Sequence, residues 1–174
     1  MLTEGQKAPD FSLPGVIYDD PAMYDLHRFV GRGHAALLYF YPADFVPNCE
    51  DDLRALSRAG WHHEDGVVVW AISGDSLFAH AAFADRYDVD LPLLSDFHAG
   101  ISESYYAVMD EWRGHHAIPQ RGLCVVDDDW TVRHAWETDD PFVAPDPAPL
   151  VGAAETLDEL VDARIEPPSV EYRH

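Results

Sequence analysis

The chain contains few cysteines and few basic residues. Cys49 and Cys124 are its two cysteines, and one lysine and ten arginines stand against 32 acidic residues, for a net charge of -21. Two cysteines exclude the disulfide framework of a small secreted domain. Because no C-x-x-C pair is present, neither a thioredoxin-type dithiol nor a zinc knuckle is indicated. A surface this acidic repels nucleic acid and anionic membranes, so we expect neither as a partner.

Long apolar runs are also missing. No stretch approaches the ~18 consecutive apolar residues of a membrane span, and residues 1–7 lack the charged, apolar and small-residue parts of a signal peptide. We therefore expect a cytoplasmic protein. The acidic residues are spread along the whole chain, and their mutual repulsion is screened over ~3 Å at 1 M salt. We predict a salt-adapted, halophilic host; the alternative is an acidic mesophilic protein.

The residues that are present favour one folded domain. Hydrophobic residues make up 47% of the 174 residues, enough for a full core. Apolar runs at 35–41 and 67–72 predict strands buried on both faces, and helical patterns follow from about Pro47 and over 76–87. We predict a domain over residues 1–163 and a polar, fraying tail over 164–174.

The second half continues the alternation. Residues 92–94 form a short apolar stretch, and residues 100–106 have a helical pattern. Residues 122–126 and 131–136 flank a three-residue turn and predict a hairpin. A last amphipathic helix is expected over 151–163. Strands alternating with helices, then a hairpin and a closing helix, predict an α/β fold with a mixed central sheet flanked by helices.

Cys49 is the first candidate for chemistry. It follows a predicted buried strand and lies at the start of a predicted helix, where unpaired backbone N–H groups point outward. That field lowers the pKa of a thiol and favours the nucleophilic thiolate. The alternative is a structural cysteine, since unpaired cysteine is among the most buried residue types. Position alone does not decide between the two.

The sequence around Cys49 resembles the active-site loop of the peroxiredoxins. Residues 41–49, Tyr-Pro-Ala-Asp-Phe-Val-Pro-Asn-Cys, are similar to the family pattern Pro-x-x-x-Thr/Ser-x-x-Cys. The likeness extends to residues 5–14, 71–96 and 121–127, and covers most of the chain up to about Leu150. It is of the AhpC/TSA type, close to the one-cysteine AhpE and BCP branches. The resemblance implies a thioredoxin-like fold with the N-terminal extension of the family.

The resemblance also implies roles for individual residues. Cys49 matches the peroxidatic cysteine, Arg121 its guanidinium partner, and Pro42 the residue that shields the thiolate. A guanidinium near the thiolate favours the charged form and can donate to a peroxide oxygen. Arg121 could also be a surface arginine paired with a carboxylate. The implied activity is reduction of hydrogen peroxide or organic hydroperoxides through a sulfenic acid. The residues expected to bind the peroxide are Tyr41, Phe45 and Val46.

Val46 departs from the family pattern because it lacks the hydroxyl of Thr or Ser. Losing a hydrogen bond to a charged group costs about 1.5–3 kcal/mol, or roughly ten- to a hundredfold in rate. The sequence leaves three alternatives: a slow enzyme, a donor such as Tyr39 or Tyr41 in place of the hydroxyl, or a non-catalytic redox sensor or interaction protein. The acids at 50–52 disfavour a thiolate, and we expect part of them to lie on a solvated helix face.

Cys124 and the histidines complete the candidates. Cys124 lies in a predicted core strand, which favours a buried inert thiol over a resolving role. We therefore expect one-cysteine chemistry with an external thiol or thioredoxin-like reductant, and the resemblance implies a homodimer. A thiol–disulfide oxidoreductase is disfavoured by the missing C-x-x-C pair. His62–His63 and His115–His116 are adjacent pairs without metal-site spacing, so neither metal nor cofactor is expected.

Overall fold

Seven strands of the computed structural model form one mixed sheet, in the order β2-β1-β5-β4-β3-β8-β9. The model describes residues 2–105, 108–143 and 146–173. The parallel centre consists of β3 (Ala35–Phe40), β4 (Val67–Ser73) and β5 (Leu93–Ser95). Antiparallel strands complete the two edges: β1 (Ser12–Ile17) and β2 (Asp20–Asp25), and β8 (Arg121–Val126) and β9 (Val132–Thr138). A separate hairpin joins β6 (Val108–Trp112) to β7 (His115–Pro119).

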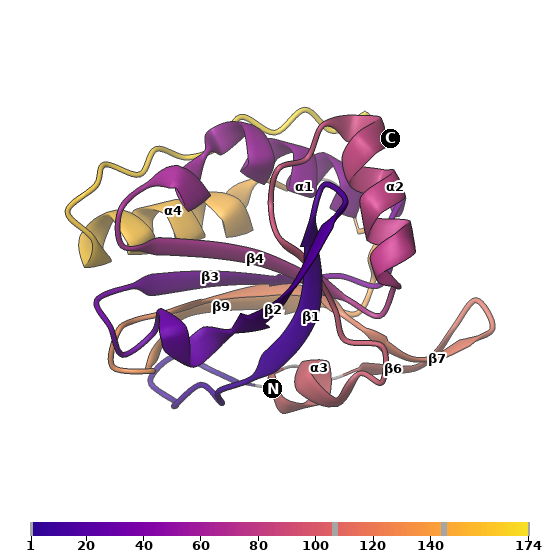
Figure 1. Ribbon diagram of the computed structural model, residues 1–174, viewed down its shortest axis with the longest axis horizontal. Helices are drawn as coiled ribbons and strands as arrows, with labels where there is room; N and C mark the ends of the chain where they lie inside the picture. Colours follow the sequence, from indigo (N-terminus) through magenta and orange to yellow (C-terminus); the bar gives the residue numbers. More distant parts are fainter. Residues whose placement is uncertain (1, 106–107, 144–145, 174) are drawn as a thin grey trace.

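Helices cover both faces of the sheet (Figure 1). The helices are α1 (Pro47–Ala59), α2 (Leu77–Tyr87), α3 (Gly100–Tyr105) and α4 (Ala148–Leu160), with 3-10 turns η1 (Leu26–Arg28) and η2 (Trp61–His63). Figure 1 shows α1, α2 and α4 on one side of the sheet and α3 on the other. No helix in the described part of the chain is both long enough and apolar enough to cross a bilayer.

The alternation of strand side chains divides the core into two clusters. Leu37 and Tyr39 of β3 pack with Leu53 of α1 and with residues of α2 and α4. Leu38 and Phe40 pack on the other face, with residues of the N-terminal segment, η1 and α3. All six residues of β3 are buried, as the continuous apolar run predicts for a central strand.

The predicted α/β fold with a mixed sheet flanked by helices is confirmed, and the β1–β2 hairpin forms the N-terminal extension. Two elements differ from prediction: the closing helix, which ends at Leu160 instead of 163, and a hairpin that was not predicted. The closing helix begins at Ala148 instead of 151, because Pro149 occupies its first turn, where proline is favourable. The β6–β7 hairpin has no strong apolar alternation, and the sequence analysis missed it.

The C-terminal segment 164–173 packs against the domain instead of fraying. Ile165 is 4% exposed and joins the core cluster on the α1 side. The indole N–H of Trp61 donates to the carbonyl of Glu166 at 3.0 Å. Val170 also packs against the same cluster. The segment therefore lies along α1, and its last residues reach the second turn of that helix.

Candidate active site at the first turn of α1

Cys49 is the third residue of α1 and is 1% exposed. Val46 precedes the helix with extended backbone, and Pro47 occupies its first turn, where a missing N–H costs nothing. The N–H of Glu50 donates to the Val46 carbonyl at 2.8 Å and closes that turn. The thiol thus lies at the positive end of the helix, as the sequence predicts, but it is fully enclosed.

The loop between β3 and α1 is anchored by buried polar contacts. The hydroxyl of Tyr41 donates to Asp44 Oδ1 at 2.8 Å, and His80 Nδ1 lies 2.8 Å from Asp44 Oδ2. The N–H of Asp44 donates to Asp75 Oδ2 at 2.6 Å. Asp44 and His80 are both buried. The carboxylate of Asp44 therefore joins the loop before α1 to α2.

The three residues predicted to bind peroxide occupy different environments in this loop. Val46 is buried in the core cluster that contains Cys49. Phe45 is 45% exposed, has a left-handed φ of 64°, and packs its ring edge-on against Phe83 of α2. Such a φ is strained for a residue other than glycine and recurs at functional loops. The hydroxyl of Tyr41 is directed to Asp44. A role for these residues in binding peroxide stays a prediction.

Arg121 and Asp52 form a buried ion pair next to Cys49. Nη2 and Nε of Arg121 donate to Asp52 Oδ2 at 2.5 and 3.0 Å, and each side chain is 2% exposed. The guanidinium also lies over the ring of Trp136, 5.2 Å from its centroid. Arg121 is the first residue of β8, and its alternation with Leu123 places it on the face of the sheet that α1 covers.

One nitrogen of Arg121 is left without a partner. Nη1 is buried and makes no hydrogen bond to any described residue. An unpaired buried donor is costly and rare in a folded protein. The unpaired Nη1 leaves a buried hydrogen-bond donor available beside the Cys49 thiol.

Tyr39 connects the ion pair to the thiol. Its hydroxyl donates to Asp52 Oδ2 at 2.7 Å and accepts from Arg121 Nε at 3.3 Å. Tyr39 also lies close enough to Cys49 to lower the pKa of the thiol, because its hydroxyl can donate to the thiolate. Of the two tyrosines that could replace the missing hydroxyl at Val46, the structure therefore brings Tyr39 to the thiol.

Burial nevertheless raises the pKa of Cys49 to about 12. The charge of Arg121 and the hydrogen bond with Tyr39 act in the opposite direction, and the carboxylate of Asp52 adds to the rise in pKa. The expectation of a lowered pKa is thus wrong for this conformation, because burial of the thiol outweighs the charge of Arg121 and the carboxylate of Asp52 raises the pKa further. The described structure holds Cys49 as a protonated thiol.

The three acids that follow Cys49 are buried, and the prediction that part of them is solvated is wrong. Glu50, Asp51 and Asp52 are 7%, 2% and 1% exposed. Glu50 pairs with Arg54 at 3.3 Å, one helical turn later. Each of the other two receives a contact from the C-terminal segment, which sequence analysis had not connected to the site.

The C-terminal segment reaches the site through two hydrogen bonds. The hydroxyl of Tyr172 lies 3.0 Å from Asp52 Oδ1, and the backbone N–H of Arg173 donates to Asp51 Oδ2 at 3.0 Å. Tyr172 therefore contacts the same carboxylate that Arg121 and Tyr39 contact. The sequence carries no signal for this contact, because the residues are separated by 120 positions.

Cys124 lies on the other side of the sheet. It is fully buried in β8, opposite Leu38 of β3, and belongs to the cluster that packs against α3. Cys49 belongs to the cluster on the α1 side. Cys49 and Cys124 form no disulfide with each other. The sheet lies between them, in agreement with a structural role for Cys124.

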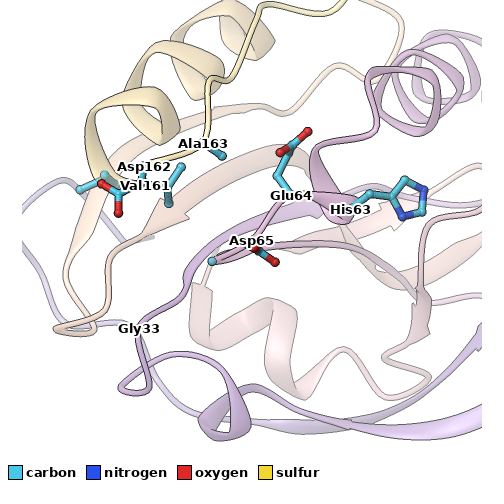
Figure 2. Close-up of a pocket in the computed structure, with 9 residues that line it drawn as sticks. Gly33, His63, Glu64, Asp65, Val161, Asp162 and Ala163 are labelled. Carbon is cyan, nitrogen blue, oxygen red and sulfur yellow. The ribbon is translucent and has the colours of Figure 1, made fainter.

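A hollow of about 640 Å³ lies away from this site. It is lined by Gly33, residues 63–66 and residues 160–163 (Figure 2). Neither Cys49 nor Arg121 lines it. The hollow therefore has no part in the chemistry of the thiol.

The raised pKa of Cys49 predicts a loss of stability in alkali. The folded state holds the thiol proton more tightly than the unfolded chain, whose cysteine has a pKa of about 8.5. The contribution of this thiol to the free energy of unfolding is therefore complete below pH 8.5. It is lost as pH rises toward 12, by up to about 1.36 kcal/mol per pH unit. Urea unfolding at pH 7 to 10 should show a steeper decline for the wild type than for Cys49→Ala. Equal slopes would contradict a buried protonated thiol.

Tyr172→Phe should loosen the C-terminal segment. Removing the hydroxyl deprives Asp52 of one donor, which costs about 1.5–3 kcal/mol if the carboxylate is charged. We expect lower stability in urea and faster alkylation of Cys49 by iodoacetamide. Tyr18→Phe is the control, because Tyr18 is a half-exposed tyrosine distant in sequence from the site. Unchanged stability and alkylation in Tyr172→Phe would show that the contact does not hold the segment.

Known proteins of one family share this sequence and fold. The family model described as AhpC/TSA matches residues 4–135. The peroxiredoxin bcp of Coxiella burnetii is 33% identical to this chain over 136 residues. The match covers 76% of this chain and 86% of that protein. The chloroplastic 2-Cys peroxiredoxin BAS1 of Spinacia oleracea is 30% identical over 139 residues, covering 75% of this chain but 51% of that protein. The chain thus spans about half the length of this second relative.

Solved structures agree with the sequence matches. The reduced 2-Cys peroxiredoxin of Plasmodium vivax superposes with a TM-score of 0.69 at 28% identity, covering 78% of this chain and 85% of that one. Peroxidoxin BcpB of Mycobacterium tuberculosis superposes with a TM-score of 0.72 at 24% identity, covering 92% and 97%; at this identity the likeness shows the fold alone. The chain belongs to the AhpC/TSA family and is a peroxiredoxin, a thiol peroxidase that uses peroxide and a thiol reductant.

Proposed function

We propose that Cys49 is the peroxidatic cysteine of this chain and that it works with Arg121 and Tyr39 in a one-cysteine cycle. The observation that carries the proposal is their meeting at the first turn of α1. The side chains of Cys49, Arg121 and Tyr39 are each at most 2% exposed. Arg121 and Tyr39 donate hydrogen bonds to the buried carboxylate of Asp52, and the same carboxylate raises the pKa of Cys49. The shielding role of Pro42 is supported by its burial in the loop before the helix.

The chemistry begins with loss of the thiol proton. The thiolate sulfur of Cys49 then attacks one peroxide oxygen, an S–O bond forms and the O–O bond breaks. The departing oxygen carries the electron pair, takes up a proton and leaves as water or an alcohol. Backbone N–H groups at the helix start and the unpaired Nη1 of Arg121 would stabilise the negative charge as it moves to that oxygen.

Tyr39 is proposed as the donor that replaces the family hydroxyl missing at Val46. In the protonated site its one hydroxyl hydrogen goes to Asp52. Arg121 and Tyr172 also contact Asp52, so the carboxylate keeps partners if that hydrogen turns to the thiolate. Tyr41 is proposed to support the loop through Asp44 instead of contacting the peroxide.

An external thiol would complete the cycle. The sulfenic acid of Cys49 condenses with that thiol, releasing water and forming a mixed disulfide, and a second thiol restores Cys49. Cys124 lies in the opposite core cluster, which supports a reductant from outside these 174 residues. A cytoplasmic location, a salt-rich host and a homodimer stay predictions.

Cys49→Ser tests the proposed nucleophile. With hydrogen peroxide and an added thiol, the wild type should turn over in a stopped-flow assay, and intact-mass analysis should find one added oxygen when the thiol is withheld. Cys49→Ser should do neither. Cys124→Val is the matched control, since it replaces the other buried cysteine with an apolar side chain, and it should stay active. A wild-type reaction no faster than that of a free thiol at the same pH would refute the proposal.

Tyr39→Phe and Tyr41→Phe separate the two candidate donors. Both tyrosines are buried on the same face of the sheet, but only Tyr39 lowers the pKa of the Cys49 thiol. Tyr39→Phe should slow the peroxide reaction roughly ten- to a hundredfold, and Tyr41→Phe should slow it far less. Val46→Thr should restore much of the rate in the Tyr39→Phe background and change little alone. Equal rates for the two Phe variants would rule out Tyr39 as the donor.

A further inference from the structure

We propose that His62, His63 and Asp90 form a binding site for a divalent transition metal of the zinc class. The two histidines end the 3-10 turn η2 after α1, and Asp90 lies between α2 and β5. One ligand atom from each residue lies within 4.8 Å of the others. The site is separate from Cys49 and goes beyond the peroxidase function.

The side chains of adjacent histidines were expected to point in different directions, but in the structure His62 and His63 both contact Asp90. His62 Nε2 lies 3.0 Å from Asp90 Oδ1, and His63 Nε2 lies 2.9 Å from Asp90 Oδ2. The ring centroids of the two histidines are 3.9 Å apart. The α-helix argument fails here because η2 is a single 3-10 turn and Asp90 approaches it from another element.

These separations suit a small ion after a slight expansion. Zinc binds histidine nitrogen and carboxylate oxygen at about 2.0–2.2 Å, which places neighbouring tetrahedral ligands about 3.3 Å apart. The observed N···O distances are a few tenths of an ångström shorter, as expected for a carboxylate drawn to two imidazoles. Two imidazoles and one carboxylate favour zinc, nickel or copper over calcium or magnesium, which prefer oxygen ligands.

His62 supplies an independent reason to expect a ligand. Its side chain is 8% exposed, and neither ring nitrogen makes a hydrogen bond to any described residue. Nε2 is close to Asp90 but is not aligned for a hydrogen bond. A buried imidazole whose nitrogens make no hydrogen bond is destabilising, and an ion that accepts the lone pair of Nε2 would remove that cost.

Asp90 is held in place by Ser57 at the end of α1. The Ser57 hydroxyl donates to Asp90 Oδ1 at 2.7 Å and is 3.1 Å from the backbone N–H of Asp90. Metal sites depend on such outer contacts to orient their ligands. A bound ion would therefore join the end of α1 to the segment between α2 and β5.

Space and access are present next to the three side chains. A cavity of about 440 Å³ is lined by His62, His63 and Asp90 together with aromatic residues, among them Tyr18 and Trp70. The side chain of His63 is 65% exposed and gives an ion a path from solvent. Water or a small external ligand can occupy the remaining coordination position, as in zinc sites with three protein ligands.

The acidic hollow of Figure 2 is a different place. Figure 2 shows the ring of His63 directed away from the side chains of Asp65 and Asp162. Those carboxylates therefore add no ligand to the histidine pair. They contribute, with the net charge of -21, to a potential that attracts cations to this side of the molecule.

Calorimetric titration with zinc chloride tests the site. The wild type should bind one zinc ion per chain, and His63→Ala should weaken binding more than about tenfold, since even an outer-shell contact is worth about 10- to 100-fold. His63 is exposed, so its replacement leaves the core intact; Asp90→Asn should give a similar loss. The matched control is the double variant His115→Ala/His116→Ala, which removes two exposed histidines from β7 and should bind zinc as the wild type does.

Cobalt substitution distinguishes this site from zinc bound at a cysteine. Bound Co²⁺ should show visible d–d bands without a near-ultraviolet thiolate charge-transfer band. The proposal is overturned if the wild type binds no zinc, if His63→Ala binds zinc as tightly as the wild type, if the His115/His116 variant loses binding equally, or if the cobalt spectrum shows a thiolate ligand. Each of these outcomes is independent of peroxide turnover, so the two proposals fail separately.

Discussion

The buried ion pair between Arg121 and Asp52 is the contact on which the site depends. It joins β8, at one side of the sheet, to the N-terminal half of α1. Both side chains are withdrawn from water, so removing either partner would leave a buried charge and cost about 3–5 kcal/mol. Because Asp52 takes Nε and Nη2, the guanidinium is fixed and Nη1 is the nitrogen left unpaired.

The same pair explains why the thiol is protonated in this conformation. Arg121 can stabilise a negative charge on either of two neighbours, the carboxylate of Asp52 or the thiolate of Cys49. Arg121 is hydrogen-bonded to Asp52, and its attraction for the thiolate is smaller than the cost of burying that charge. Turnover therefore requires a proton to leave and the departing oxygen of the peroxide to take up a proton. The hydroxyl of Tyr39 lies between these groups and can serve either the carboxylate or the sulfur.

Acidic residues have a local structural role beside their effect on net charge. The three acids that follow Cys49 are buried and paired, one with a neighbouring arginine and two with other elements. Asp44 and Asp90 similarly tie loops to helices through histidine or serine. The net charge of the sequence suggests that such residues lie on the surface and repel one another. In the structure, each of these carboxylates instead accepts a contact from another part of the fold.

The sequence by itself determined the α/β fold, the start of a helix near Pro47 and the place of Cys49 in the first turn of that helix. These follow from local rules: apolar runs that form buried strands, proline at a first turn, and a motif of nine consecutive residues. Only the tertiary structure decided the pairing of Arg121 with Asp52, the proximity of Tyr39 to the thiol and the burial of the thiol. The contact of Tyr172 with Asp52 and the contacts of His62 and His63 with Asp90 could not be predicted from the sequence either. The physical reason is that these contacts join residues far apart in the chain, where no periodicity or spacing rule applies.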